Sequence, residues 1–521
     1  MPSRGLTSLI AAQVDIPYLI YTTKTYNMKK IFNLKLFVII CCLSLFNSCT
    51  EEKAENGRIT TDEQYHANIF AGTSLETFYY WNKDISNDLL RLNPETNTDP
   101  ITTVNEIRYH EGDTEIDRWT MLTDDFESFN SSLEGVYTTY GYQPITYLLD
   151  ESTGQCVSAV AYVYQNSPAE KAGLKRGDII YEIDGKPLTV NNYTDLFYSS
   201  QITLSLAAYD ATINTIVPTE QTVTMQAVEM YENPILCYKT IDLDNGNKIG
   251  YLAYSSFDLN SIPELIEICK DFKAKGVKKL VLDLRYNGGG YVITENVLAS
   301  MFAPQDVVDS KAIFEKEDYN ELLTASGWSS VTRFTTTFNY ESVGLNVSTE
   351  GANIGLEHIY ALIGPNTASA SEALIGGLMP YMPITLIGEQ SHGKYCTGIP
   401  LSSKELYDMM EEVTPTAIKN WGIYVMISIY MNSENETPCM PNGLTPDIKA
   451  TDDPMQPVQL GDENEALLRV ALEKEGKQYP ETNALSRSII PWQKVKGQPQ
   501  KANFGKRILL PAADRPITFK K

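Results

Sequence analysis

The chain has 521 residues, a length at which roughly two to four domains with substantial hydrophobic cores are expected. It carries 66 acidic and 42 basic residues, so its formal net charge is −24. Proteins that bind the phosphate backbone of nucleic acids carry basic patches, so this charge balance argues against a nucleic-acid partner.

Cysteine and histidine are too scattered to indicate a metal centre. Of the eight cysteines, the five that follow position 49 show neither a disulfide framework nor the spacing of zinc ligands. The four histidines have no metal-binding spacing either. We therefore expect no metal site.

The first 60 residues are typical of a targeting signal rather than of a folded domain. A basic stretch begins at Met28, an apolar run covers residues 36–46, and Ser48 precedes Cys49. The run has signal-peptide length and is too short to span a membrane. The pattern resembles a bacterial lipoprotein signal that is lipidated at Cys49, and a plain secretory signal is the alternative. It predicts a lipid-anchored protein of a bacterial cell envelope, periplasmic or at the outer-membrane surface. We expect a non-native start (1–27), a lipoprotein-type signal (28–49) and a linker (50–60).

Apolar and aromatic residues recur at helical spacing after the linker, which predicts a small N-terminal helical domain over 61–135. Phe78, Tyr79 and Trp81 belong to this pattern, and Phe129 continues it. An aromatic stripe at this spacing is more often part of a core than of a ligand site. We therefore expect these rings to be buried.

Between positions 136 and 230 the sequence changes to short β-type runs separated by turns. The stretch from Ser167 to Asp178 begins with a Ser-Pro helix cap and contains a glycine placed to end that helix. It resembles a segment of PDZ domains, so a PDZ domain is predicted over 136–230. The resemblance implies that a peptide adds as a strand to a sheet edge and that backbone amides hold its carboxylate. The peptide-binding loop would lie at Gly141 and Tyr142, although the usual glycine-rich pattern is missing there.

Residues 231–478 alternate between predicted strands and helices. A buried strand over 280–284 runs into the glycine triplet 288–290, and a helix over 292–302 follows. Consecutive glycines at such a turn let the backbone approach a ligand and leave amides exposed. The turn lacks the Lys-Ser/Thr pair of a P-loop and the spacing of a dinucleotide-binding loop, so a nucleotide site is not expected.

Ser369 lies at a predicted strand-to-helix turn, between a strand over 358–364 and a helix that begins at Ala370. There the hydroxyl gains the positive end of the helix dipole, and the Ala370 amide can hold an oxyanion. A second strand, 384–388, ends in a loop that presents Lys394. Burial disfavours the charged form of a lysine and can make it a general base. Both features also have a plain structural interpretation, because serine commonly caps helices and Gly-Lys pairs commonly lie in solvated turns.

Five further motifs occur in a single order along the core. They are GYLAYSSF (250–257), DLRYNGGG (283–290), NTASASE (366–372), GEQSHGK (388–394) and NGLTPDI (442–448). Together with the PDZ segment they resemble the C-terminal processing (tail-specific) serine proteases, over roughly residues 60–475. The resemblance implies a crotonase/ClpP-like α/β protease core with the PDZ domain inserted ahead of it. With the N-terminal helical domain, the predicted fold class is multidomain α/β and β, with the protease core over 231–478.

The resemblance also implies roles for individual residues. It implies that Ser369 is the nucleophile and Lys394 the general base. It also implies that Ala370 and either Gly288 or Gly289 form the oxyanion hole, and that Glu372 is a supporting carboxylate. The chain departs from the family at Gly398, where members often have a glutamine that orients the lysine. Residues 395–397 also replace the usual small residues.

The predicted function is that of a serine endopeptidase. It would cleave extended or unfolded proteins, recognised near their C-terminus through the PDZ domain, by a Ser/Lys acyl-enzyme mechanism without any cofactor. Its partners would be protein or peptide substrates and, through Cys49, a membrane. Three alternatives are a catalytically silent peptide-binding lipoprotein, which the Gly398 departure favours, a hydrolase based on His392, and a crotonase-like acyl-CoA enzyme. The basic tail (residues 479–521) and the oligomeric state carry no prediction.

Overall fold

The computed structural model describes residues 58–479, apart from 198, 211, 214, 329 and 330, together with residues 493–495 and 506–509. The predicted start, signal and lipidation site at Cys49 lie outside these described residues, as does most of the basic tail. All described residues fall within one unit of the chain, residues 54–518. None of the helices among them is both long and apolar enough to cross a membrane.

The region that follows the predicted linker is mainly helical, and a short strand attaches it to the core. Helix α2 (Asp62–Phe78) begins after Thr61, whose side chain accepts a hydrogen bond from Gln64 N in a capping box. Strand β3 (Met121–Thr123) pairs antiparallel with a long core strand, β23 (Gly422–Asn432). The other elements are η1 (Asp88–Arg91), α3 (Pro100–Ile107), β1 (His110–Glu111), β2 (Thr114–Glu115) and α4 (Phe126–Leu133). This region therefore also contributes a strand to the core.

The segment predicted as a PDZ domain folds into an antiparallel sheet with two short helices. Its strand order is β10-β9-β7-β6-β5, and β25 (Gln493–Lys494) from the basic tail extends the β5 edge. Ser167 caps α5 by accepting a hydrogen bond from Glu170 N, as the sequence predicts. The bounds are β4 (Val136–Thr139), β5 (Tyr142–Asp150), β6 (Gln155–Val163), α5 (Pro168–Lys171), β7 (Ile179–Ile183), β8 (Lys186–Pro187), α6 (Tyr193–Phe197), β9 (Gln201–Asp210), β10 (Thr215–Gln226) and β11 (Val228–Tyr231).

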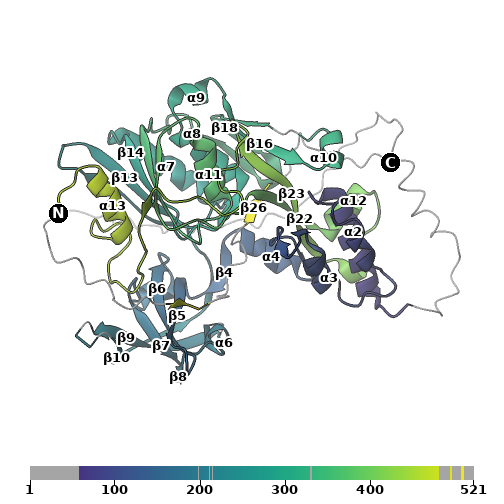
Figure 1. Cartoon of the computed structure of the whole chain (residues 1–521), viewed down its shortest axis with the longest axis horizontal. Helices are drawn as coiled ribbons and strands as arrows, with labels where there is room; N and C mark the ends of the chain where they lie inside the picture. The colour runs from purple at the N-terminus through teal and green to yellow at the C-terminus, as the bar shows by residue number, and fades with distance from the viewer. Residues whose placement is uncertain are drawn as a thin grey trace, which may run out of the picture. The chain divides into compact units, whose positions relative to one another are not determined.

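The first core sheet has the order β12-β13-β14-β20-β21-β24 and is parallel from β13 to β24. Alternate residues of its strands face opposite sides. Helices α7, α8 and α11 lie side by side on one face, and α13 covers the other (Figure 1). The bounds are β12 (Ile235–Asp242), β13 (Lys248–Tyr254), α7 (Ile262–Ala274), β14 (Lys279–Asp283), α8 (Val292–Phe302), β20 (His358–Ile363), α11 (Ala370–Leu378), β21 (Ile384–Gly388), β24 (Ile448–Lys449) and α13 (Ala466–Lys474).

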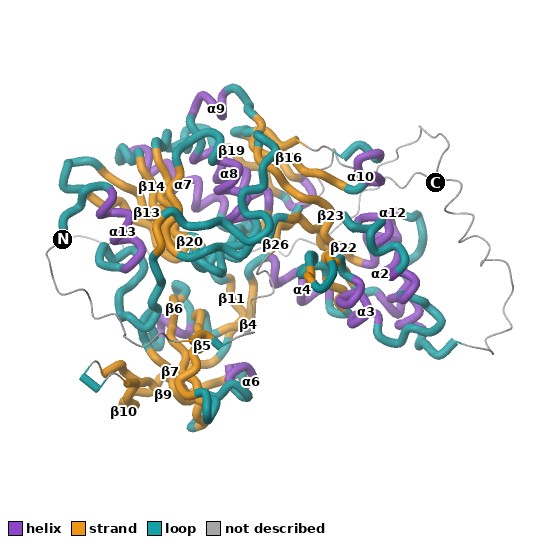
Figure 2. The backbone as a smooth tube through the Cα atoms, in the orientation of Figure 1, coloured by secondary structure: helices purple, strands orange, loops and turns teal. Residues whose placement is uncertain are grey.

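The second core sheet has the order β15-β26-β22-β23-β16-β17, and β22 and β23 are its longest adjacent pair (Figure 2). Strand β26 (Lys506–Ile508) comes from the basic tail and fills the place between β15 and β22. The other bounds are β15 (Gly289–Tyr291), α9 (Gln305–Asp309), β16 (Ile313–Tyr319), α10 (Glu321–Ala325), β17 (Val331–Arg333), β18 (Thr337–Tyr340), η2 (Glu341–Val343), β19 (Leu345–Ser348), β22 (Cys396–Ser402), α12 (Ser403–Met409) and η3 (Thr416–Ile418). Because α11 follows β20 and β22 follows β21, Ser369 and Lys394 both lie where the two sheets meet.

Candidate active site

Ser369 occupies a strained turn between β20 and α11. Its backbone has φ 64° and ψ −116°, a conformation that is uncommon for a residue with a side chain and is concentrated at functional sites. The side chain is fully buried, and its Oγ has no hydrogen-bond partner among the described residues. The hydroxyl therefore forms no side-chain hydrogen bond that caps the helix. The plain structural interpretation of this serine would require such a bond. A buried hydroxyl without a partner is costly, so its retention calls for a function.

The Glu372 carboxylate fixes the Ser369 turn and the Lys394 loop to each other. Its Oε2 accepts hydrogen bonds from Ser369 N at 2.8 Å and from Lys394 N at 2.9 Å. Its Oε1 accepts from Gly393 N at 2.7 Å and from the Ser391 hydroxyl. Burial raises the pKa of Glu372 to about 7, although these hydrogen bonds oppose the shift. Glu372 is therefore placed to position the backbone rather than to act on the Ser369 hydroxyl.

The glycine turn lies directly against Ser369. A Cβ on Gly289 would lie 2.8 Å from Ser369 Cβ, so no larger residue fits there without a shift. Gly289 N donates to Asn287 Oδ1 at 2.9 Å, so this amide is already engaged. Gly288 N and Ala370 N donate to no acceptor within the part of the chain that the structure describes. Of the predicted oxyanion donors, these two amides are the ones that can hold an oxyanion.

Lys394 is buried completely, and its backbone lies next to that of Ser369. Burial lowers the pKa of its amine to about 8. Nζ donates to the Tyr424 hydroxyl at 3.1 Å and lies 5.5 Å from the centre of the Trp119 ring. No ion pair with a described carboxylate compensates the charge of Nζ. The structure thus brings the two predicted dyad residues together, but Nζ is hydrogen-bonded to Tyr424 and not to the Ser369 hydroxyl.

Tyr424 is a site residue that the sequence did not indicate. It is the third residue of β23. A Cβ on Gly398 would lie 2.6 Å from Tyr424 Cζ and 2.4 Å from Met426 Cε, so the glycine makes room for these side chains. The Gly398 departure therefore does not leave the lysine without a polar partner, because Tyr424 supplies one from the neighbouring strand.

Two aromatic residues of the N-terminal region also reach the site. Trp119 faces the Lys394 amine, and the Phe129 ring packs beside Tyr424 with centroids 6.2 Å apart. The His392 ring packs against Trp119 at 6.4 Å, and burial lowers its pKa to about 4. Phe129, from the aromatic stripe predicted as core, and Trp119, which was not predicted, thus form one wall of the site. No group of three or more described His, Cys, Asp or Glu side chains is arranged to hold a metal ion.

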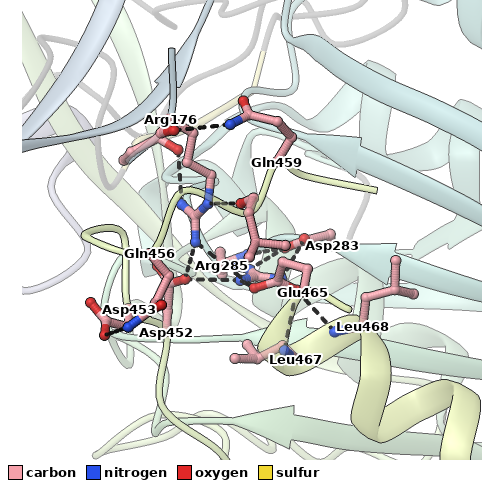
Figure 3. A network of polar contacts seen from close by, with 12 residues as sticks. Arg176, Asp283, Arg285, Asp452, Asp453, Gln456, Gln459, Glu465, Leu467 and Leu468 are labelled. Atoms are coloured by element: carbon pink, nitrogen blue, oxygen red, sulfur yellow. Dashed lines mark hydrogen bonds and ion pairs between the residues drawn. The ribbon is translucent and has the colours of Figure 1, made fainter. Parts of the chain in front are cut away.

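A buried network of charges joins the PDZ segment to the glycine turn (Figure 3). Arg176 of the PDZ segment donates to the Tyr286 hydroxyl at 2.7 Å and to Asp452 at 2.6 Å. Arg285 bonds to Asp283, Asp452 and Glu465. Burial alone would raise the pKa of Asp452, but the two arginines hold it well below its usual range. Since Tyr286 lies two residues before Gly288, this network ties the start of the glycine turn to the PDZ segment.

The predicted peptide-binding loop lies at the start of β5. Gly141 has φ 77°, and a Cβ there would lie 2.2 Å from Ser167 Cβ, so glycine is required. Its amide donates to Thr139 Oγ1 at 2.9 Å and is therefore engaged. Tyr142 begins β5, where it pairs with Val163. In this structure β25 pairs with the edge of β5 further along that strand, between Thr146 and Leu148.

A pocket lies between the PDZ segment and the glycine turn. Its lining combines Tyr162 of β6 and Tyr164 just after this strand with Gly288 and Gly289 of the turn. Asp258 also lines it, and burial raises the pKa of this carboxyl to about 7. The pocket therefore extends from the PDZ sheet to the glycine turn.

Comparisons with known proteins agree with this architecture. Residues 248–450 match the model of peptidase family S41, and residues 159–206 match that of the PDZ domain. A carboxyl-terminal-processing protease of Picosynechococcus sp. is 26% identical over 318 residues, which cover 59% of this chain and 64% of that protein. A carboxyl-terminal-processing protease of Synechocystis sp. is 28% identical over 246 residues, covering 46% of this chain and 50% of that protein. The chain thus spans between half and just under two thirds of the length of these curated relatives.

A solved structure of a candidate S41 protease from Bacteroides fragilis shares the fold. Its TM-score is 0.59 at 23% identity, and the match covers 78% of this chain and 97% of that one. The resemblance inferred from the motifs is therefore confirmed, and so are the PDZ domain and the α/β protease core.

Proposed function

We propose that this chain, whose core is a peptidase family S41 domain preceded by a PDZ domain, is a serine endopeptidase with Ser369 as nucleophile and Lys394 as general base. One observation carries the proposal. A single oxygen of Glu372 binds the backbone amides of both residues, at a place where burial brings the lysine pKa to about 8. A partnerless serine hydroxyl and an uncompensated amine are thereby held as neighbours.

In the first half of the reaction, the neutral Lys394 amine takes the proton of Ser369 Oγ as that oxygen bonds to the peptide carbonyl carbon. A change in the lysine torsions brings Nζ from Tyr424 to Oγ. The carbonyl oxygen becomes an oxyanion, which the amides of Gly288 and Ala370 stabilise. With a pKa of about 8, roughly one tenth of the amine is neutral at pH 7.

In the second half, the protonated Lys394 amine gives its proton to the leaving nitrogen as the C–N bond breaks. The acyl group stays on Ser369 Oγ as an ester. Water then attacks this ester, with the lysine again accepting a proton, and the carboxylic acid product leaves with Oγ–H restored. Apart from the substrate and this water, every group used in these steps belongs to the chain itself.

The PDZ segment would deliver the substrate. Two relatives that match 59% and 46% of this chain are named for carboxyl-terminal processing, so we extend recognition near a C-terminus to this chain. The β5 edge accepts strands, and the pocket beside Tyr162 leads toward Gly288. The signal-like stretch that ends at Cys49 further supports a lipid-anchored enzyme of the cell envelope.

The test compares wild type with Ser369→Ala and Lys394→Ala on an unfolded protein that has a free apolar C-terminus. Ser326→Ala and Lys404→Ala, exposed positions outside the site, serve as matched controls. Loss of cleavage in both site variants and not in the controls supports the dyad. Survival of cleavage in Lys394→Ala would implicate another base, and binding without cleavage in every variant would identify a silent peptide-binding protein.

A further inference from the structure

The basic tail places a strand inside the active-site sheet. Residues 506–509, the tail strand, lie between β15 and β22. The strand runs parallel to β15 with Gly289 opposite Lys506 and Tyr291 opposite Ile508, and Leu509 N donates to Gly398 O at 3.0 Å. Its neighbours are therefore the glycine turn on one side and the strand that follows Lys394 on the other.

The tail strand touches the groups assigned to catalysis. A Cβ on Gly289 would lie 2.7 Å from the Lys506 carbonyl oxygen and 2.8 Å from Ser369 Cβ, so this glycine lies between the tail and the serine. The Arg507 carbonyl oxygen accepts a hydrogen bond from the Tyr424 hydroxyl at 2.9 Å. The same hydroxyl accepts from Lys394 Nζ. The tail thus stabilises the arrangement in which the lysine amine is hydrogen-bonded to Tyr424.

The Arg507 side chain fills a buried acidic cluster. Its guanidinium bonds to Glu295, Glu315, Glu317 and Thr397. Burial raises the pKa of Glu295 and Glu315 even though the guanidinium opposes this. Three carboxyl groups in one dry cluster repel each other unless a cation lies among them. The planar guanidinium has donors pointing in several directions and so bonds to all three carboxyl groups at once, a geometry that the compact ammonium group of a lysine does not match.

The same tail also occupies the edge of the PDZ sheet. Gln493 pairs with Leu148 and Lys494 with Tyr147 in antiparallel register, and Val495 N donates to Thr146 O at 3.0 Å. The Val495 side chain packs against the hydrophobic core of the PDZ segment. Adding an antiparallel strand to a sheet edge is how PDZ domains take peptides. Two segments of one tail therefore lie at the two places where a substrate would be held.

We infer that the place between β15 and β22 is a peptide-strand site whose acidic cluster is a subsite for arginine, and that the tail strand is its resident intramolecular ligand. One consequence follows if the proposed function holds, and in this the inference rests on that function: the tail blocks substrate entry until it is displaced. An intramolecular ligand competes at a high effective concentration, so a peptide added from solution binds weakly while the tail is in place. A substrate that displaces it is expected to present arginine to the same cluster.

The test measures peptide binding without catalysis. All proteins carry Ser369→Ala, and a fluorescent peptide with the sequence of residues 500–512 is titrated by anisotropy. Arg507→Ala empties the acidic cluster, and Leu509→Pro removes the hydrogen bond to Gly398 while Arg507 stays. Arg91→Ala is the matched control, because Arg91 pairs with Glu106 at the surface. A second peptide, with alanine in place of the residue corresponding to Arg507, probes the subsite.

We expect both tail variants to bind the first peptide at least about tenfold more tightly than the control, and the alanine peptide about tenfold more weakly than the first peptide. Affinities within twofold of the control in both variants would overturn the inference. Loss of the folded state in both variants would also overturn it, because the tail strand would then be a part of the core. The same tail variants with Ser369 retained are assayed for cleavage of an unfolded protein. The expected changes in peptide affinity, together with no cleavage by any protein that retains Ser369, would refute the proposed function alone. Cleavage that depends on Ser369 but is unaffected by either tail variant would refute only the blocking role.

Discussion

Two buried cations of the core, Arg285 and Lys394, differ in what surrounds them. The Arg285 guanidinium is enclosed by three carboxylates, Asp283, Asp452 and Glu465. The Lys394 amine is equally buried, but it meets a phenol hydroxyl and two aromatic faces and forms no ion pair with a described residue. Burial penalises both charges, and only the first is compensated by opposite charge.

The difference separates a structural charge from a reactive one. Carboxylates hold the pKa of Arg285 far above any accessible pH, against the effect of burial, so its charge is permanent and ties segments together. The pKa of Lys394 falls to about 8, so its proton can leave near neutral pH. The Glu372 carboxylate raises the pKa of Lys394 only slightly against the effect of burial, and its oxygens are engaged by backbone amides and a serine hydroxyl. The site thus keeps a carboxylate next to the lysine without neutralising the lysine charge.

The most direct way to break this distinction is to give Lys394 a permanent charge. Lys394→Arg keeps a cation at the site, but arginine cannot release its proton and so cannot act as a base. We expect kcat/KM for an unfolded protein substrate to fall roughly a thousandfold. Lys404→Arg, on the exposed face of α12, is the control. Retention of more than a tenth of the wild-type kcat/KM would show that Lys394 is not the base.

The stability of the two sites should respond in opposite directions to the same replacement. Arg285→Met leaves the buried Asp283 carboxylate without its cation and Glu465 with only Arg176 at 3.8 Å, and we expect the free energy of unfolding to fall by about 3–5 kcal/mol. Lys394→Met removes an uncompensated charge. A pKa lowered from 10.5 to about 8 corresponds to a penalty of about 3 kcal/mol at pH 7, so this variant should be more stable than wild type.

The sign and pH range of the lysine effect can be checked by urea unfolding. The folded pKa of Lys394 lies below the unfolded value, so the penalty is complete below pH 8 and disappears as the pH rises toward 10.5. The stability difference between wild type and Lys394→Met should therefore narrow over this range. A Lys394→Met protein less stable than wild type at pH 7 would contradict the comparison.

The pH dependence of catalysis sharpens the comparison further. If the neutral amine is the active form, kcat/KM should rise about tenfold per pH unit below pH 8 and level off above it. A hydrolase based on His392 would instead level off just above pH 4, because burial lowers the pKa of that imidazole to about 4. The measurement is kcat/KM between pH 5 and 10 for a substrate without titratable groups in that range. A flat profile from pH 6 to 10 would exclude the lysine base.

The parts of the site that the sequence predicted are those encoded in short contiguous segments. The turn at Ser369, the loop at Lys394 and the glycine turn at Gly288 each follow a strand directly, so local patterns of strand, glycine and helix start place them. The PDZ segment was predicted for the same reason, because the cap at Ser167 is satisfied within three residues.

The parts that the sequence did not predict depend on which strands become neighbours. Nothing about Tyr424 within its own strand indicates that β22 will bring it to Lys394, and nothing about Trp119 indicates a wall of the site. Gly398 was interpreted as the loss of a residue that orients the lysine. The polar partner of Lys394 is instead Tyr424, which comes from the neighbouring strand. The tail strand is the extreme case, because Arg507 meets glutamates about 190 to 212 positions earlier in the chain.

The smallest effect is expected from removing the hydroxyl that lies between the lysine and the tail. In Tyr424→Phe the Lys394 ammonium loses an acceptor, so its pKa should fall further and the rising limb of kcat/KM should move to lower pH. Because Tyr424 positions the amine and does not itself touch substrate in the mechanism, kcat should change by about tenfold or less. Tyr360→Phe, which loses only a hydrogen bond to Glu475, is the matched control. If the pH profile of kcat/KM is unchanged in Tyr424→Phe, the Tyr424 hydroxyl does not affect the pKa of Lys394. The space that Gly398 leaves for Tyr424 would then serve only side-chain packing.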